Sequence, residues 1–388
     1  YEPPGRYHWF DGDGMIHAVR LRDGRASYRN RWVRSEGLME ERRAGKALYP
    51  GLLSLQPTEA PRFKVTANTN VVSHAGKLLA LVENALPTEL VPCTLETIGL
   101  YDYSGRLAGP MTAHPKIDAE TGEMLFFGYS PFPPYLQFHV ADREGRLVRS
   151  EVIDVAWPSM MHDFAITKSR VVFFVCPVVF DLGKLAATGT VLHWEPERGT
   201  RIGVMPRSGG NADVRWFETD PCYLFHPMNA YDEDGAVVVD VARYEELRFM
   251  SPGAARDPGW RDRNEARLHR WRLDLARGEV GSRPLDDRSV EFPRVDERLV
   301  GRKHRYGYLA AAGPEQDGTR LPLWTAIEKH DLERGTKEVR AFGAGNGAAE
   351  PLFVPRSADA AEDDGWVLVL VYDRERNASD FLVLDARD

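Results

Sequence analysis

Short apolar runs separated by polar turns recur along most of the chain. The turns are rich in Asp, Glu and Gly, as at residues 142–145 and 232–235. Runs of this length between such turns are typical of β-strands. We therefore predict strands at residues 124–128, 136–140, 171–175, 191–194, 236–241, 268–273, 308–312, 366–372 and 381–384.

The N-terminal part of the chain has a more varied pattern. The Asp-Gly-Asp-Gly run at residues 11–14 predicts a tight turn between strands at 7–10 and 15–19. An Arg- and Glu-rich stretch at residues 34–46 predicts a helix or a surface loop. A further strand pair is expected at residues 70–73 and 77–83.

Two later segments interrupt the strand pattern. Residues 178–187 predict a short helix, and residues 250–266 form a connection rich in Pro, Gly and Arg. Inserts of this kind often lie over one face of an all-β array, where they can cover a site.

The spacing of the strands indicates the fold class. Many short strands at regular intervals, with few helical periods between them, favour a large all-β array such as a propeller. The chain of 388 residues is compatible with one such domain. No strict sequence repeat is present, which excludes a WD40-type propeller.

Composition excludes several kinds of partner and compartment. The net charge is −8 and no basic stripe is present, so nucleic acid is not an expected partner. Three cysteines without C-x-x-C spacing predict neither a disulfide framework nor a thiolate zinc site, and favour the reducing cytoplasm. No run approaches the roughly 20 apolar residues that span a bilayer. Because the sequence begins at Tyr1 without Met, we expect it to start partway into a longer protein.

Three of the eleven histidines share one local context. His114, His162 and His226 each have apolar neighbours and are followed by Pro or Asp. The intervals of 48 and 64 residues are about the length of a four-stranded blade with its loops. Each imidazole could then point at the axis of a propeller. Each alone would more often be a structural histidine, but together they predict a metal site, with iron or zinc favoured over copper.

Four other histidines lie in polar or turn-adjacent positions. We expect them to face solvent or to support hairpins, as partly buried histidines commonly do. They are His139, His193, His269 and His330.

Three glutamates lie among apolar residues, where an unpaired carboxylate would be costly. They are Glu83, Glu291 and Glu350. Metal-bound histidines usually donate their second ring N–H to a carboxylate. We therefore predict that these glutamates are the outer partners of the histidines, although each alone would more often be a surface residue.

The motifs together resemble the carotenoid cleavage oxygenase family, which includes apocarotenoid, retinal-forming, lignostilbene and isoeugenol cleavage enzymes. They occur in the family's order and extend over nearly the whole chain. They are the segments 10–15, 112–116, 161–164, 225–226, 291–293 and 350–356.

The resemblance implies a single domain over residues 1–388, a seven-bladed β-propeller with a dome of loops and helices over one face. It also implies a non-haem Fe(II) on the axis, held by four neutral histidines. His114, His162 and His226 match the first three ligands, and the three glutamates match the outer carboxylates. The fourth family histidine would follow Asp388. We therefore expect that closing segments are missing from both ends of this sequence.

The family reaction implies the activity. O2 adds across a C=C bond of a conjugated lipophilic or aromatic substrate, which splits into two carbonyl products. The phenol-cleaving members carry a Lys immediately before the first outer glutamate, whereas this chain has Val82. An apolar residue there favours an uncharged, elongated substrate, a carotenoid or apocarotenoid.

Other interpretations stay open at this point. One is cleavage of a phenolic stilbene or phenylpropene, and another is a propeller that binds without catalysis. The predicted helix at residues 178–187 also leaves open a weak peripheral contact with a membrane. The sequence does not predict the oligomeric state.

Overall fold

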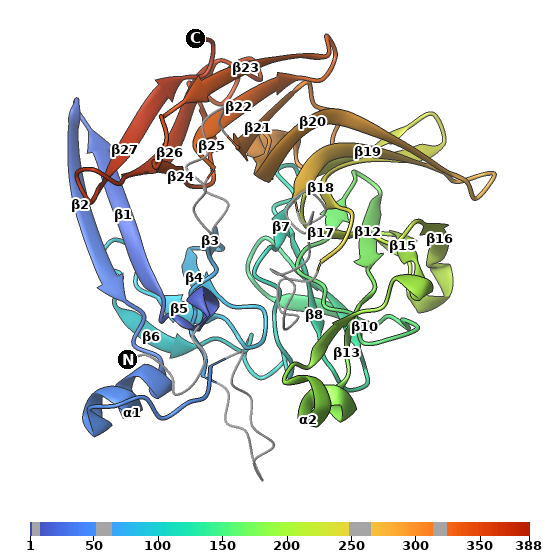
Figure 1. Cartoon of the computed structure of the whole chain (residues 1–388), viewed down its shortest axis with the longest axis horizontal. Helices are drawn as coiled ribbons and strands as arrows, with labels where there is room; N and C mark the ends of the chain where they lie inside the picture. Colours follow the sequence, from blue (N-terminus) through green and yellow to red (C-terminus); the bar gives the residue numbers. More distant parts are fainter. Residues whose placement is uncertain (2–7, 52–63, 248–264, 313–323) are drawn as a thin grey trace.

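Antiparallel β-sheets make up nearly all of the described protein. The computed structural model describes residues 1, 8–51, 64–247, 265–312 and 324–388. Within these ranges the α-helices are α1 (Glu36–Ala44) and α2 (Leu185–Thr188). The sheets follow one another around a central region in a propeller-like arrangement (Figure 1). This confirms the predicted all-β class.

The strands are grouped by sheet. The first part of the chain forms the hairpin β1 (Met15–Arg22) and β2 (Arg25–Trp32), and the sheet β3 (Asn70–His74), β4 (Lys77–Leu81), β5 (Thr88–Leu90) and β6 (Thr97–Leu100). Next come the sheet β7 (Lys116–Ile117), β8 (Met124–Tyr129), β9 (Leu136–Ala141) and β10 (Leu147–Val152), the sheet β11 (Ala165–Ile166), β12 (Arg170–Val175), β15 (Thr200–Pro206) and β16 (Arg215–Thr219), and the pair β13 (Val178–Phe180) and β14 (Leu192–Trp194).

The second half of the chain contains two further sheets. One has seven strands: β17 (Tyr223–Glu233), β18 (Ala236–Tyr244), β19 (Ala266–Asp274), β20 (Val280–Arg294), β21 (Tyr306–Ala311), β22 (Ala326–Asp331) and β23 (Thr336–Ala341). The other contains β24 (Gly347–Ala348), β25 (Leu352–Pro355), β26 (Gly365–Asp373) and β27 (Ala378–Asp385). All nine apolar runs predicted as strands lie largely within these strands.

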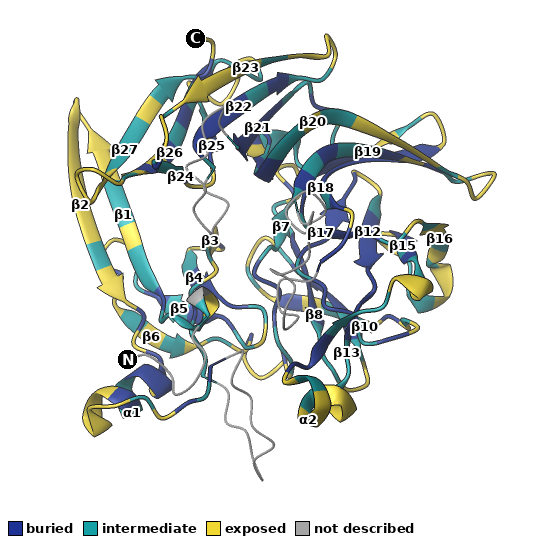
Figure 2. Ribbon diagram, viewed as in Figure 1, coloured by how far each residue is buried: buried dark blue, intermediate teal, exposed yellow. Residues whose placement is uncertain are grey.

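Strand β12 shows why its apolar run is continuous rather than alternating. Successive side chains of a strand point to opposite faces of the sheet. Val172 and Phe174 pack into the core shared with β17, β18 and β19, whereas Val171 and Phe173 pack into the core shared with β8 and β9. Both faces are therefore covered by neighbouring sheets. Figure 2 shows the contrast between the buried inner strand β18 and the exposed strands β2 and β23.

One local prediction is confirmed and another is wrong, each for a clear physical reason. Helix α1 confirms the helical alternative for residues 34–46: Ser35 accepts a hydrogen bond from the Leu38 amide, and Gly45 ends the helix in the left-handed region. The predicted hairpin turn at residues 11–14 is wrong. Residues Trp9–Asp11 form a 3₁₀ turn, and the hairpin turns instead at Asp23 and Gly24, whose φ values are 50° and 69°.

The predicted helix at residues 178–187 is only partly present. Val178–Phe180 forms strand β13, which pairs with β14, and helical turns begin only at Leu182. The β-branched pair Val178-Val179 suits a strand better than a helix. The predicted connection at residues 250–266 falls almost entirely outside the described residues.

Ion pairs link sheets that are distant in sequence. The buried carboxylate of Asp118, after β7, accepts hydrogen bonds from Arg207 Nη1 at 2.5 Å and from Arg302 Nη2 at 3.3 Å. Burial would raise the pKa of Asp118, but the hydrogen bond and charge of Arg207 and two backbone amides lower the pKa to about 2. The pairs therefore tie β15 and the segment after β20 to the sheet that begins at β7.

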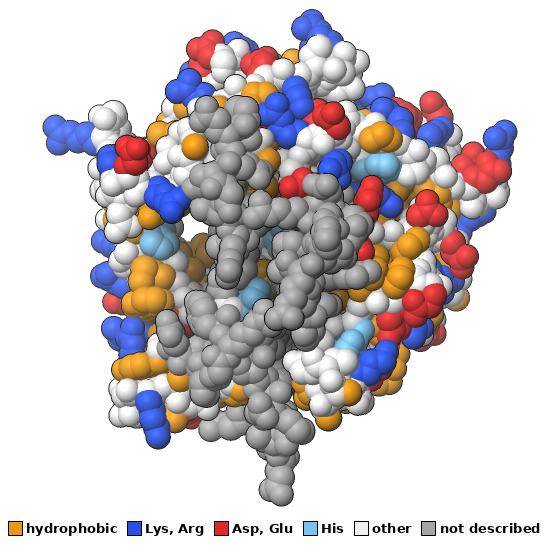
Figure 3. Space-filling view, in the orientation of Figure 1, with side chains coloured by type: hydrophobic (Ala, Val, Ile, Leu, Met, Phe, Trp, Pro, Cys, Tyr) orange, Lys and Arg blue, Asp and Glu red, His pale blue; other side chains and the backbone are white. Residues whose placement is uncertain are grey.

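The surface and the cysteines agree with the composition. Basic and acidic side chains are interspersed around the rim of the face in Figure 3. Cys93, Cys176 and Cys222 are free in the described structure. No helix in the described part of the chain has the length and apolar character needed to cross a membrane.

Candidate metal centre

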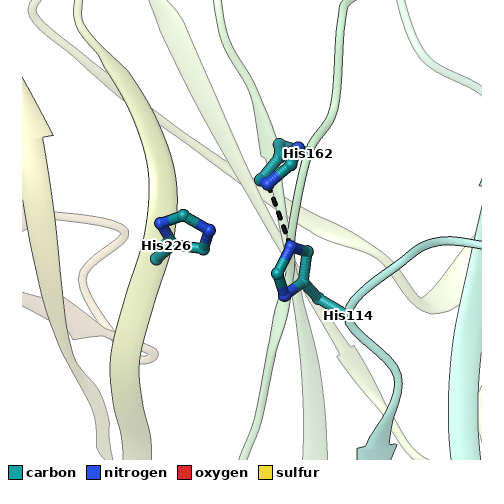
Figure 4. A group of neighbouring side chains, drawn as sticks. All are labelled: His114, His162 and His226. Atoms are coloured by element: carbon teal, nitrogen blue, oxygen red, sulfur yellow. Dashed lines mark hydrogen bonds between the residues drawn. The ribbon is translucent and has the colours of Figure 1, made fainter. Parts of the chain in front are cut away.

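Three of the predicted site histidines converge in space. Ligand nitrogens of His114, His162 and His226 all lie within 4.8 Å of one another. Nε2 of His114 is 2.9 Å from Nε2 of His162, and the His226 ring centroid lies 4.9 and 5.0 Å from the other two centroids (Figure 4). Residues separated by 48 and 64 positions therefore form one cluster.

The sheet topology explains this convergence. His114 lies two residues before β7, His162 lies three residues before β11, and His226 lies in β17. Each of these strands stands at the edge of its sheet in the strand order. The pairing of β17 with β18 shifts register between Leu224 and Pro227, so a bulge lies at His226. Bulges of this kind re-aim side chains next to functional sites.

Two of the predicted glutamates hold two of these histidines. Nδ1 of His162 donates to Glu83 Oε2 at 3.0 Å, and Nδ1 of His226 donates to Glu291 Oε2 at 2.6 Å. Because Nδ1 carries the hydrogen bond, Nε2 of each ring presents its lone pair to the cluster. Glu291 is only 2% exposed, so its carboxylate depends on these donors.

Glu350 and Val82, the other two positions predicted for the site, do not hydrogen-bond to the histidines in the described part of the chain. Glu350 lies between β24 and β25 and accepts a hydrogen bond from Arg294 Nη1 at 3.2 Å. Within the described ranges it has no hydrogen bond to any of the three histidines. Val82 is buried and immediately follows β4, next to Glu83.

Burial and charge set the protonation of the cluster. Burial lowers the pKa of His114 well below its usual value, and the neighbouring His162, His226 and Lys116 lower it further. His114 is therefore neutral, the form that can bind a metal. Burial alone would lower the pKa of His226, but the charge and hydrogen bond of Glu291 raise it.

The donor set fits one metal ion. Two nitrogens bound to one ion at about 2.1 Å and at a right angle would lie about 3.0 Å apart, and the His114 and His162 nitrogens are 2.9 Å apart. The nearby carboxylates of Glu83 and Glu291 engage the outer ring nitrogens rather than the cluster. An all-imidazole donor set suits iron, zinc, copper or nickel.

Two aromatic residues that belong to the predicted motifs, but were given no role there, lie beside the cluster. The Phe225 ring lies 5.2 Å from that of His162, and the Phe292 ring lies 5.2 Å from that of His226. Phe292 has a φ of 51°, unusual for a bulky residue, at a register shift in β20. The sequence signal that could have identified both residues as part of the site is their position next to His226 and Glu291.

Charged neighbours of the histidines were also missed. Lys116 pairs with the buried Asp163 at 2.8 Å, so the residues that closely follow His114 and His162 are tied together. Arg294 pairs with Glu297 and with Glu350. Lys116, Asp163 and Arg294 each lie within three positions of a predicted site residue.

Two histidines expected to face solvent do not. His139 is 3% exposed and His330 is 5% exposed, so the solvent-facing alternative is wrong for both. His139 pairs in register with Ser150 across the β9–β10 hairpin, which agrees with the hairpin alternative. His139 hydrogen-bonds to Ser150 Oγ at 2.8 Å, and burial lowers its pKa to about 4. The neighbours of His330 are the polar Lys329 and Asp331, which point to the opposite strand face because side chains alternate along a strand, so polar neighbours do not show that a histidine is exposed.

His330 belongs to a second group of possible ligands, with Asp286 and Glu328. Lys337 pairs with Asp286 at 2.6 Å, and Arg288 pairs with Glu328 at 3.0 Å. These cations already balance both carboxylates. The group therefore needs no metal ion.

Known proteins with the same organisation are found by both sequence and structure. The model of the family described as RPE65, retinal pigment epithelial membrane protein, matches residues 1–388. The isoeugenol monooxygenase of Pseudomonas nitroreducens is 35% identical over 401 residues, covering 99% of this chain and 84% of that protein. A carotenoid cleavage oxygenase of Mycobacterium tuberculosis is 37% identical over 433 residues, covering 99% and 84%. The crystal structure of Pseudomonas brassicacearum lignostilbene dioxygenase superposes with a TM-score of 0.93 at 34% identity, covering 100% of this chain and 84% of that one.

Proposed function

Because the chain belongs to the RPE65 family, whose members include carotenoid cleavage oxygenases, we propose that it holds Fe(II) through His114, His162 and His226 and cleaves a C=C bond of a conjugated substrate with O2. The chain is an oxygenase of this family, with relatives named as isoeugenol monooxygenase and carotenoid cleavage oxygenase. In the proposed reaction both oxygen atoms of O2 are transferred to the two carbons of the broken double bond, giving two carbonyl products.

One observation carries the proposal. Three imidazoles meet within 4.8 Å, and two of them are bound through their outer nitrogens to the buried or half-buried carboxylates of Glu83 and Glu291. A binding-only propeller has no need for ligand nitrogens oriented in this way. The arrangement is the one expected when histidines are kept neutral and directed at a metal.

The protein's own residues prepare the site. When bound, iron(II) in an all-imidazole site supplies open positions and the capacity to activate O2. Glu83 and Glu291 fix the ring orientation of their histidines, and burial keeps His114 neutral. Phe225 and Phe292 provide apolar walls beside the cluster, which orient a conjugated substrate and exclude water.

A carotenoid or apocarotenoid is the proposed substrate. Val82 is buried, apolar and adjacent to Glu83, and it provides no cation for a phenolate. A lysine at this position would pay a large desolvation cost unless paired with an anion, so its absence favours an uncharged substrate.

A phenolic stilbene or phenylpropene is the second candidate. The TM-score of 0.93 with a lignostilbene dioxygenase and the likeness to an isoeugenol monooxygenase favour it. Overall likeness reports the scaffold, whereas the residues next to the metal decide the substrate. In choosing the substrate class, we therefore give the residue type at Val82 more weight than the overall likeness.

The finer architecture follows from the same premise. We propose a single domain over residues 1–388 with seven blades and a dome over one face. Division of the seven-stranded sheet at the long strand β20 gives two blades, the other four-stranded sheets give four, and the hairpin β1–β2 belongs to a seventh. We also propose a cytoplasmic location, with at most weak peripheral contact with a membrane.

A substrate panel tests the proposed function. The protein reconstituted with Fe(II) is assayed under O2 with one apocarotenal and one 4-hydroxystilbene. We expect two carbonyl products from the apocarotenal, with turnover falling roughly 100-fold or more in His162→Ala. Stilbene turnover alone would assign the phenolic class, and cleavage of neither substrate would contradict the proposal.

A further inference from the structure

Tyr244, at the end of β18, contacts the outer side of the candidate metal centre. Its hydroxyl donates to Glu291 Oε1 at 2.9 Å, while Glu291 Oε2 accepts from His226 Nδ1 at 2.6 Å. We propose that Tyr244 is a positioning residue for the metal centre, which it serves by holding Glu291 and thereby His226. This inference rests on the proposed function, because it concerns the same histidines.

The hydrogen bonds to Glu291 show why the hydroxyl matters. Oε2 also accepts from the amide of Phe292 at 2.6 Å, so two donors already share that oxygen. Within the described residues, Tyr244 is the donor to the other oxygen, Oε1. A buried carboxylate oxygen without a donor is costly. Removal of the hydroxyl would leave Oε1 unpaired and the carboxylate free to turn away from His226.

The backbone places Tyr244 for this role. Tyr244 pairs in register with Tyr223 on β17, three residues before His226. Its ring also packs edge-on against Phe225, at a centroid distance of 5.6 Å. The same strand pair therefore positions the donor and the histidine, and Glu291 reaches both from β20.

The alternative is that the Tyr244 hydroxyl only satisfies the buried carboxylate of Glu291, without effect on the metal. Tyr223 separates the two explanations. It is the cross-strand partner of Tyr244 and is 1% exposed, yet its hydroxyl has no hydrogen-bond partner in the described structure. Tyr223→Phe therefore removes a buried hydroxyl beside the site without breaking the contact with Glu291.

Cobalt(II) binding is the test, because it needs no turnover. The metal-free protein is titrated with Co(II), and the visible absorption band gives both the dissociation constant and a spectrum of the site. Outer partners of metal-bound histidines typically contribute 10- to 100-fold in affinity, so we expect about tenfold weaker binding and an altered band in Tyr244→Phe. Tyr223→Phe is expected to bind within about twofold of the parent protein. Equal affinities for the two variants would overturn the inference.

Glu291→Gln tests whether Tyr244 acts through Glu291. With a glutamine, the amide oxygen can face His226 and Phe292, and its NH2 group then faces the tyrosine oxygen. The hydroxyl no longer donates to a carboxylate, so adding Tyr244→Phe should weaken binding by less than about twofold more. A full additional tenfold loss would contradict action through Glu291.

Failure of the proposed function gives a different result. If the parent protein binds no Co(II), the metal centre itself is refuted, whatever the variants do. If Tyr244→Phe folds poorly, its titration is repeated in an osmolyte that favours the folded state, with Tyr223→Phe treated in the same way. Equal Co(II) affinities for the two variants in the osmolyte would overturn the inference.

Discussion

Replacement of Glu291 by glutamine tests how strongly the outer carboxylate supports its histidine. The side chain is buried, with hydrogen bonds from His226, Phe292 and Tyr244. Glutamine keeps the shape and one acceptor oxygen but removes the charge. The substitution therefore isolates the contribution of the negative charge to metal binding.

The magnitude follows from the kind of hydrogen bond that changes. A hydrogen bond to a charged group contributes about 1.5–3 kcal/mol, and a neutral one contributes about 0.5–1.5 kcal/mol. The His226 bond to Glu291, at 2.6 Å and in a buried setting, should lose about 1.4 kcal/mol of support. That difference is about tenfold in the metal dissociation constant.

The assay is competition for Fe(II) between the protein and a chromogenic chelator under anaerobic conditions. We expect the dissociation constant of Glu291→Gln to rise about tenfold. Glu362→Gln is the matched control, because Glu362 accepts two backbone hydrogen bonds at 2.7 Å, from Arg305 and Tyr306, away from the histidines. An unchanged constant in Glu291→Gln, or an equal rise in both variants, would refute the reasoning.

Three further substitutions test other parts of the account. Asp118→Asn should lower the free energy of unfolding in urea by about 2 kcal/mol at pH 7, because the folded pKa of about 2 lies below the ordinary 3.8. The carboxylate contributes fully to stability above about pH 4, and this contribution is lost as the pH falls towards 2. An equal loss of stability in the variant at pH 2 and at pH 7 would contradict the prediction. Phe173→Ala leaves a cavity at a fully buried site between β12 and β9 and should lower the free energy of unfolding by about 3–5 kcal/mol. The control Val148→Ala, at an exposed position, should change the melting temperature little. Similar melting temperatures for the two variants would contradict the core assignment. Val82→Lys should shift the ratio of kcat/KM towards 4-hydroxystilbene over apocarotenal, and no shift in a folded variant would remove Val82 from the substrate argument.

The sequence predicted the histidine cluster because each of its three histidines has a local signal. His114, His162 and His226 each lie where an apolar segment meets Pro or Asp, and their spacing follows the blades. Strand β12 was also predictable from a local pattern, because a continuous apolar run of strand length indicates burial on both faces.

Other features depend on contacts that no local pattern shows. Tyr244 reaches Glu291 from a position 47 residues away, and the pairing of β18 with β19 and of β19 with β20 brings the two strands together. The left-handed conformation of Phe292 arises at a register shift, which cannot be inferred from a bulky residue type. The hairpin expected at residues 11–14 failed because the Asp-Gly signal recurs at residues 23–24, where the flanking strands actually pair.

Iron content measured beside O2 consumption tests the central claim most directly. The parent protein, His162→Ala and His139→Gln are loaded anaerobically with Fe(II), desalted and analysed by mass spectrometry for metal per chain. The account predicts about one iron per chain in the parent and in His139→Gln, whose histidine is buried but lies outside the cluster, and a large loss of both iron and substrate-dependent O2 consumption in His162→Ala. Iron retained in His162→Ala, together with undiminished O2 consumption, would contradict it.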